Sequence, residues 1–193
     1  MLTYISSVLL YITTLPFQSA QTIPEITLTD AVSGNEFSLS SLKDSKAVVV
    51  IFTSNYCPYA KLYEKRISSL IDTYRSKNVR FVLINSNDPA QSPGDNPVSM
   101  SKKVSEMKWN VPFLIDDQQK AASLFGAEKN PEAFVLVPSS QGFQIKYHGS
   151  IDDNPQVASD VSHAYLRNAI DAVLKGEPQM VEQTHPTGCM IKK

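Results

Sequence analysis

The segment Val48–Leu70 limits the possible folds of this chain more than any other stretch. It opens with five consecutive apolar residues, Val48–Phe52, most of them β-branched, a run that is too short for a typical helix and typical of a buried strand. Polar residues end the run, and Pro58 follows Cys57 where the first turn of a helix tolerates proline. We therefore expect a strand, a short turn, one cysteine and then a helix.

Cys57 is the candidate nucleophile of this chain. A thiol at the start of a helix faces unpaired backbone N–H groups and the positive end of the helix dipole, and both favour the thiolate. Such a position lowers the pKa of a cysteine from about 8.5 to roughly 3.5–7.5. The alternative is a buried, inert cysteine, but the polar neighbours Ser54 and Asn55 favour an accessible one.

Composition sets broad limits on the function. The 193 residues suffice for one domain with a full core, and the net charge of −1 argues against a basic surface for nucleic acid. Cys57 and Cys189 are the two cysteines, so they form a structural disulfide, a redox pair or two unrelated thiols. His148, His163 and His185 are scattered without the spacing of metal ligands, so we expect neither a metal nor another cofactor.

The N-terminal segment has the character of a secretory signal. The first charged residue is Glu25, residues 8–12 are apolar, and the small pair Ser19-Ala20 follows. This pattern predicts a signal peptide over residues 1–20, although no Lys or Arg precedes its apolar centre. We expect export to a periplasm or outside the cell, where disulfides form, and no stable membrane span. The alternative is an ordinary apolar strand or helix in a cytoplasmic protein.

The rest of the chain alternates between strand and helix patterns. A hairpin is expected at 25–39, and a second buried strand at 79–85 completes a strand–helix–strand unit with a parallel pair. Downstream the pattern predicts a polar loop at 85–99, a helix at 100–107, a strand at 111–115, a helix at 118–125, strands at 132–137 and 143–149, and a helix at 161–174. The polar loop is either a solvated surface or the rim of a functional crevice. Residues 25–176 should form the domain, and 177–193 a tail.

Four motifs in this order resemble a known family. They are Asn55-Tyr56-Cys57-Pro58-Tyr59, Ile84-Asn85-Ser86-Asn87-Asp88, Asn130-Pro131-Glu132 and Gly188-Cys189-Met190-Ile191-Lys192. The chain is identified by them as similar to the alkyl hydroperoxide reductase/thiol-specific antioxidant family, the peroxiredoxin-like redoxins. The resemblance implies an α/β thioredoxin-like fold with a central mixed sheet flanked by helices and an N-terminal β-hairpin extension. It also implies a cis bond before Pro131, with this proline packed beside the reactive sulfur.

The resemblance implies a thiol-dependent oxidoreductase in which Cys57 attacks a disulfide or a peroxide. Its partners would be a thiol reductant or a disulfide-bearing protein. Cys189 is a possible resolving thiol, but it could equally be a free thiol or an intermolecular link. The expected substrate groove comprises Ser54, Asn55, Tyr56, Pro58 and Pro131.

Three positions depart from familiar members of this superfamily. Ala60 stands where a thioredoxin has its second cysteine, Val50 stands where peroxiredoxins have a proline, and Lys129 is the one cation in residues 126–134. A lysine lacks the bidentate fork of the expected arginine. These departures keep a second hypothesis open, a non-catalytic thioredoxin-like binding module.

Overall fold

The computed structural model describes residues 21–193, and the predicted signal peptide over residues 1–20 lies outside them. Within this part of the chain an eight-stranded mixed sheet has the order β1-β9-β8-β4-β5-β6-β2-β3. Its strands are β1 (Thr22–Ile23), β2 (Thr27–Asp30), β3 (Glu36–Ser38), β4 (Ala47–Phe52), β5 (Val79–Asn85), β6 (Phe113–Ile115), β8 (Glu132–Ser139) and β9 (Gly142–Gly149). A separate two-stranded ladder pairs β7 (Lys129–Asn130) with β10 (Cys189–Met190).

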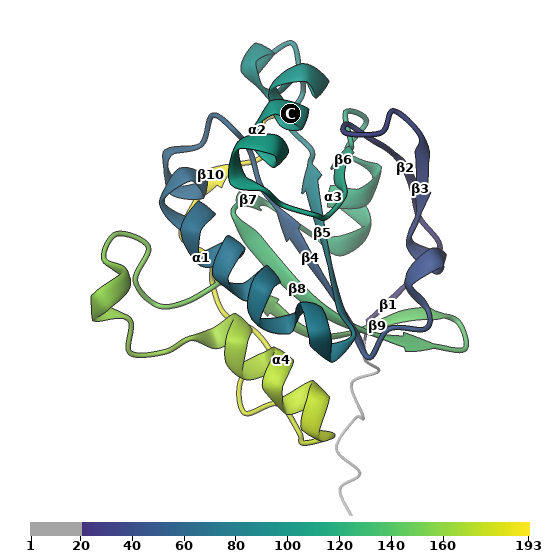
Figure 1. The fold of residues 1–193 in the computed structure, drawn as a ribbon, viewed down its shortest axis with the longest axis vertical. Coiled ribbons are helices and arrows are strands. Elements are labelled where there is room, and N and C mark those ends of the chain that lie inside the picture. Colours follow the sequence, from purple (N-terminus) through teal and green to yellow (C-terminus); the bar gives the residue numbers. More distant parts are fainter. Residues whose placement is uncertain (1–20) are drawn as a thin grey trace, which may run out of the picture.

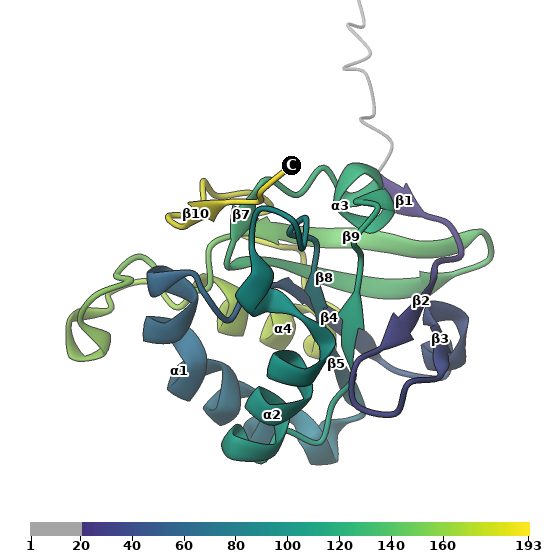
Figure 2. The same ribbon diagram turned by 90° about the horizontal axis from the view of Figure 1, so that it is seen from above.

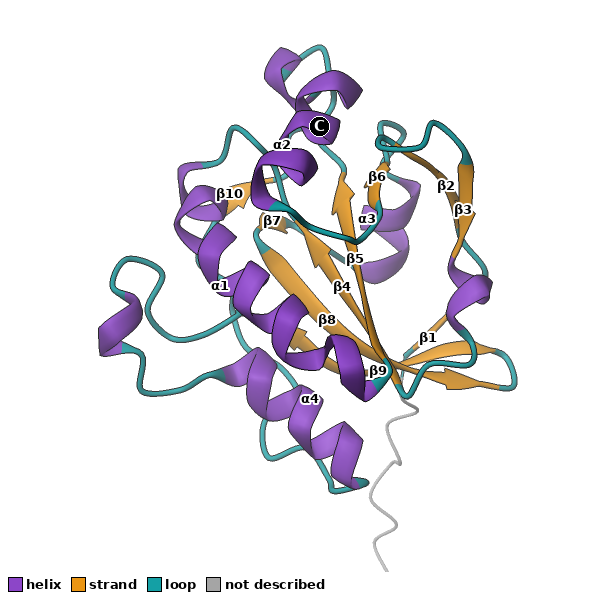
Figure 3. Ribbon diagram, in the orientation of Figure 1, coloured by secondary structure: helices purple, strands orange, loops and turns teal. Residues whose placement is uncertain are grey.

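The helices cover both faces of the sheet. They are α1 (Pro58–Tyr74), α2 (Pro97–Met107), α3 (Lys120–Phe125) and α4 (Tyr165–Lys175), with short 3-10 turns at Leu39–Leu42, Arg75–Lys77, Pro93–Asp95 and Ala158–Asp160. Figures 1 and 2 show α1, α2 and α4 on one face and α3 on the other. Figure 3 shows the strands as one twisted layer between them.

The central strand β4 explains this layering. All six of its residues are buried, and they alternate between two cores. Val49 and Ile51 pack with α1, α2 and α4, whereas Val50 and Phe52 pack with α3. A strand buried on both faces needs apolar side chains at every position, so its sequence is a continuous apolar run. The apolar run at Val48–Phe52 therefore follows from the position of β4 between two helical layers.

The expected strand–helix–strand unit is confirmed. β4 pairs in parallel with β5 and antiparallel with β8, and β5 pairs in parallel with β6. The N-terminal hairpin is also confirmed, because β2 pairs with β3 and extends the sheet beyond β6. β1, β7 and β10 were not predicted, since strands of two residues carry no periodicity.

Three helices begin at a different residue than predicted, and one of them, α3, begins at Lys120 rather than at 118 because Gln119 has a positive φ. The second helix begins at Pro97 rather than at 100, because the side chain of Asn96 accepts a hydrogen bond from the Ser99 amide and Pro97 fits the first turn. The last helix begins at Tyr165 rather than at 161. There the Asp153 carboxylate accepts a hydrogen bond from the Ser162 amide and holds that residue in the preceding loop.

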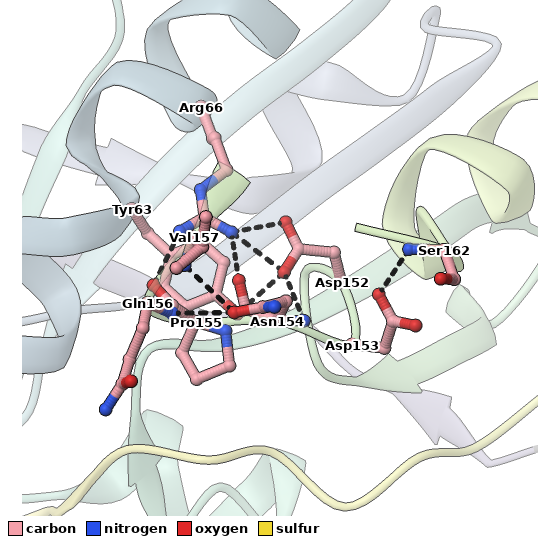
Figure 4. A network of polar contacts seen from close by, with 9 residues as sticks. All are labelled: Tyr63, Arg66, Asp152, Asp153, Asn154, Pro155, Gln156, Val157 and Ser162. Carbon is pink, nitrogen blue, oxygen red and sulfur yellow. Dashed lines mark hydrogen bonds and ion pairs between the residues drawn. The ribbon is translucent and has the colours of Figure 1, made fainter. Parts of the chain in front are cut away.

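A long connection between β9 and α4 is fastened to α1 by a buried ion pair. Arg66 Nη1 lies 2.7 Å from an Asp152 carboxylate oxygen and also donates to the Asn154 carbonyl, while Nη2 donates to the Pro155 carbonyl (Figure 4). The Tyr63 hydroxyl donates to the same carboxylate, and burial together with that carboxylate raises the pKa of Tyr63. Since the pair is desolvated and hydrogen-bonded, we infer that it orders the connection.

The segment 177–193 runs along the domain. It passes the β9 edge, where the His148 amide donates to the Glu182 carbonyl and the Thr184 amide donates to the His148 carbonyl. A Cβ on Gly149 would lie 2.3 Å from Thr184 Oγ1, so this close passage requires glycine. No helix among residues 21–193 is long and apolar enough to cross a bilayer.

Candidate functional site

Cys57 lies where the sequence predicts it, between β4 and α1. It is the N-cap residue of α1, with extended backbone angles, and Pro58 occupies the first helical position. The Cys57 side chain makes no capping hydrogen bond, and only 4% of the residue is exposed. Its Sγ lies 3.0 Å from the carbonyl oxygen of Asn130. The sulfur is therefore at the helix start but buried against the loop before β8.

The two cysteines form a disulfide within the chain. Cys57 and Cys189 are joined across 132 residues of sequence, with 5.9 Å between their Cα atoms, in the range usual for disulfides. The sequence left open whether Cys189 is a free thiol, an intermolecular link or a resolving thiol. In this state of the protein Cys189 is neither a free thiol nor an intermolecular link, because the C-terminal segment brings it to Cys57.

The cis bond expected between Asn130 and Pro131 is confirmed. Asn130 pairs with Cys189 in the β7–β10 ladder, so the cis-proline loop and the segment bearing Cys189 are neighbouring strands. A Cβ on Gly188 would lie 2.4 Å from the Asn130 carbonyl oxygen. Glycine at 188 is therefore required for β10 to approach this loop closely enough to reach Cys57.

Buried anchors hold β10 and the segment before it in place. Ile191 is 4% exposed and packs in the core on the α3 face, and its amide donates to the Glu128 carbonyl. Tyr147 Oη hydrogen-bonds with Thr184 Oγ1, and burial raises the pKa of Tyr147, which keeps the hydroxyl neutral. Cys189 is therefore held by contacts that do not involve its sulfur.

Glu132 secures the other strand of this ladder. Its Oε2 accepts hydrogen bonds from the Glu128 and Lys129 amides, and its Oε1 lies 3.3 Å from His148 Nε2. The His148 ring also stacks on Phe134. Among residues 21–193 no group of His, Cys, Asp and Glu could hold a metal ion.

The residues expected to line a groove occupy different environments. Ser54 is buried, donates its hydroxyl proton to Asp95, and accepts hydrogen bonds from the Tyr56 and Cys57 amides. Asn55 is half-buried, and its amide donates to Asp95. Tyr56 is 65% exposed, Pro58 is exposed, and Pro131 is buried. The hydroxyl proton of Ser54 is thus committed to Asp95 rather than free for a substrate.

Sequence reasoning missed Asp95 as a residue of this site. It belongs to the polar stretch 85–99, for which we expected either a solvated loop or a crevice rim. Several of these polar residues are instead buried, and Asp95 bonds to the turn before Cys57; the buried residues are Asn85, Ser86, Asn87, Ser92 and Asp95. The available signal was the position of this stretch, which begins where a parallel strand ends.

Three cavities of the described residues lie away from the disulfide. A cavity of about 700 Å³ lies between β9, the end of α4 and residues 177–183, and includes neither cysteine. At the disulfide itself, Cys57 is buried and Cys189 is half-buried.

Comparison with solved structures identifies the fold. The solution structure of a thioredoxin-like protein in its oxidised form superposes with a TM-score of 0.63 at 18% identity, covering 82% of this chain and 97% of that one. A hypothetical protein from Sinorhizobium meliloti 1021, known from a crystal structure, is 34% identical with a TM-score of 0.81, covering 90% and 93% of the two chains. The fold and site define a thioredoxin-like protein with a disulfide at the start of α1.

Comparison of sequences then gives the family. The model of the AhpC/TSA family matches residues 20–158, and the chain belongs to that family. The putative peroxiredoxin bcp of Helicobacter pylori (strain ATCC 700392 / 26695) is 33% identical over 107 residues. This match covers 55% of the present chain and 64% of the relative, so it spans less than two thirds of that protein.

Proposed function

We propose that this chain is a thiol-dependent peroxidase whose Cys57 and Cys189 alternate between a disulfide and two thiols. The observation that carries the proposal is the disulfide itself, which joins the helix-start cysteine to a cysteine 132 residues away in the same chain. Membership of the AhpC/TSA family supports the same class of chemistry. In this cycle Cys57 is the nucleophile and Cys189 the resolving thiol.

Burial of Cys57 supports a small oxidant. With 4% of the residue exposed in the disulfide-bonded state, Cys57 lies in surroundings that offer little room for a protein disulfide, whereas a peroxide needs only a narrow approach. The Cys57 thiolate attacks one peroxide oxygen, the O–O bond breaks, and an alcohol or water leaves after protonation. The sulfur is oxidised to a sulfenic acid as the peroxide is reduced. Tyr56, Pro58 and Pro131 would shape the approach, and Ser54 and Asn55 would hold the turn.

The more exposed sulfur supports a route for the reductant. Cys189 is half-buried, so an incoming thiolate reaches its Sγ more easily than that of Cys57. Attack on Cys189 forms a mixed disulfide and releases Cys57 as a thiolate, and a thiol that favours its anion is the better leaving group. A second thiol of the reductant then breaks the mixed disulfide and leaves both cysteines reduced.

A comparison of two oxidants tests this proposal. We expect the protein with dithiothreitol to consume hydrogen peroxide at least about 10³-fold faster than Cys57→Ser, because the variant lacks the nucleophile. Insulin disulfide reduction by the same sample should stay near background. If peroxide consumption by the wild type equals that of Cys57→Ser with every thiol tried, the chain is instead a non-catalytic binding module. Fast insulin reduction would make it a disulfide reductase.

We also propose that the protein is exported after removal of residues 1–20. The uncharged, apolar start of the sequence supports export. Expression of the full chain in a bacterium should release a protein that begins near Gln21, as read by intact mass. A full-length mass in the cytoplasmic fraction would contradict this.

A further inference from the structure

A buried carboxylate lies beneath the turn that carries Cys57. Asp95 is 5% exposed, and its carboxylate accepts hydrogen bonds from Ser54 Oγ at 2.8 Å, Ser92 Oγ at 2.7 Å, the Asn55 amide at 2.7 Å and Asn87 Nδ2 at 2.8 Å. Among residues 21–193 no Lys, Arg or His forms an ion pair with it. Burying a carboxylate is costly unless hydrogen bonds compensate for the lost water. The Asp95 carboxylate therefore holds its four hydrogen-bond donors in place.

Asn87 connects this carboxylate to the C-terminal segment. Its Nδ2 donates to Asp95, and its Oδ1 accepts from the Lys192 amide at 2.9 Å and from Asn130 Nδ2 at 3.2 Å. A carboxylate only accepts and a backbone N–H only donates, so the orientation of the Asn87 amide is determined. The backbone of Lys192 makes a second hydrogen bond, because its carbonyl oxygen accepts from the Asp88 amide.

The same contacts leave one buried acceptor without a partner. Asn130 is fully buried, and its Oδ1 finds no donor among the described residues. An unpaired buried acceptor is costly, and each such group in a folded protein calls for an explanation. The explanation here is that the side-chain amide of Asn130 is oriented so that its Nδ2 donates to Asn87 Oδ1, which leaves Oδ1 of Asn130 without a donor. This hydrogen bond connects the cis-proline loop to Asn87.

Asn87 therefore joins three segments that are far apart in the sequence. Through Asp95 it reaches the turn before Cys57, through Asn130 it reaches the loop that contacts Cys57 Sγ, and through Lys192 it reaches the strand of Cys189. We propose that Asn87 is a positioning residue for the reaction between the two cysteines, which keeps Cys189 opposite Cys57 when the disulfide is open. None of its hydrogen bonds involves a sulfur, so breaking the S–S bond does not by itself break them. This inference rests on the proposed cycle.

The step that Asn87 assists is the closure of the disulfide. The Cys189 thiolate attacks the Cys57 sulfenic acid, the S–S bond forms and the S–O bond breaks. The departing hydroxide takes a proton to become water, so the step needs no further oxidant. Its rate and equilibrium depend on the effective concentration of one thiol at the other, which is what Asn87 raises.

Equilibration with dithiothreitol measures that effective concentration without any peroxide. We expect the equilibrium constant for the Cys57–Cys189 disulfide against oxidised dithiothreitol to fall roughly tenfold in Asn87→Ala, because one buried amide no longer holds the tail. Asn110→Ala, at an exposed asparagine, is the matched control and should equal the wild type. Alkylation of the free thiols followed by intact mass gives the disulfide fraction. A constant within twofold of the wild type in Asn87→Ala would overturn the inference.

Asn87→Asp separates positioning from a general loss of structure. Its carboxylate still accepts from Lys192 but repels Asp95, unless the two carboxylates share a proton. The loss in the dithiothreitol equilibrium constant of Asn87→Asp relative to the wild type should therefore shrink as the pH is lowered from 8 to 5. The corresponding loss in Asn87→Ala should not shrink. Of the neighbouring charged groups, the Asp88 carboxylate accepts from the Ala90 amide, Lys192 Nζ donates to the Gln91 carbonyl, and the Asp116 carboxylate accepts from Ser86 Oγ. A defect in Asn87→Asp that is unchanged by pH would contradict the inference.

The two proposals fail in different experiments. If peroxide is not consumed but Asn87→Ala shifts the dithiothreitol equilibrium, the peroxidase proposal fails and the positioning role stands. If peroxide is consumed and Asn87→Ala leaves that equilibrium unchanged, the positioning role fails alone. Circular dichroism of each variant shows whether it is folded, and Asn87→Asp at low pH supplies the result if Asn87→Ala does not fold.

Discussion

Cys189→Ser is expected to preserve the first reaction of Cys57 with hydrogen peroxide and to slow steady-state turnover with a dithiol reductant by roughly 10²-fold. The first step needs only the Cys57 sulfur, whereas resolution loses a thiol that the fold holds within disulfide reach. The variant should therefore accumulate the sulfenic acid on Cys57. Dimedone labelling followed by mass spectrometry measures that species, and peroxide consumption measures the turnover.

Two controls sharpen this prediction. Cys57→Ser should show neither labelling nor turnover, which separates loss of the nucleophile from loss of the resolving thiol. The wild type should pass rapidly to the disulfide and take up little dimedone. Equal steady-state rates in the wild type and Cys189→Ser would mean that an external thiol resolves Cys57, and the chain would then be a one-cysteine peroxidase.

Reduction of the disulfide is expected to lower the free energy of unfolding by about 5 kcal/mol in the chain-entropy account, because the cross-link spans 132 residues. This value assumes that the anchors of the C-terminal segment, such as buried Ile191, stay in place when the disulfide opens. Urea unfolding followed by the fluorescence of buried Trp109 gives both free energies. Cys189→Ala serves as the permanently reduced form.

A small difference between the unfolding free energies of the oxidised and reduced proteins would be informative too. If the oxidised and reduced proteins unfold within about 1 kcal/mol of each other, the cross-link strains the folded chain or the unfolded chain keeps its ends close. Such a result would show that the disulfide adds little to the stability of the folded chain. It would contradict a structural role for the Cys57–Cys189 bond.

Much of the fold could be predicted from local sequence patterns. The apolar run that became β4, the hairpin of β2 and β3, and the glycine that ends α3 all follow from residues within a few positions of one another. The position of Cys57 at the start of α1 follows in the same way, since a proline after a strand–turn pattern favours a helix start. The cis bond at Pro131 came from the family resemblance, because spacing alone favours trans.

Long-range pairings could not be read from the sequence. Two-residue strands such as β10 have no periodicity, so the docking of Cys189 beside Asn130 had no local signal. The same limit applies to Asp95, which belongs to a stretch that the sequence predicts to be either a solvated loop or the rim of a crevice. Its burial depends on donors from Ser54 and Asn87, which only the folded chain assembles.

The sequence by itself determined that one cysteine stands at the start of a helix after a buried strand, and that no second cysteine follows three residues later. Those properties depend on neighbouring residues, whose steric and hydrogen-bonding preferences act at once. The tertiary structure alone decided which sulfur is the partner of Cys57 and what holds it there. That choice rests on the backbone pairing of Cys189 with Asn130 and on contacts between segments more than 100 residues apart, whose free energy exists only in the assembled fold.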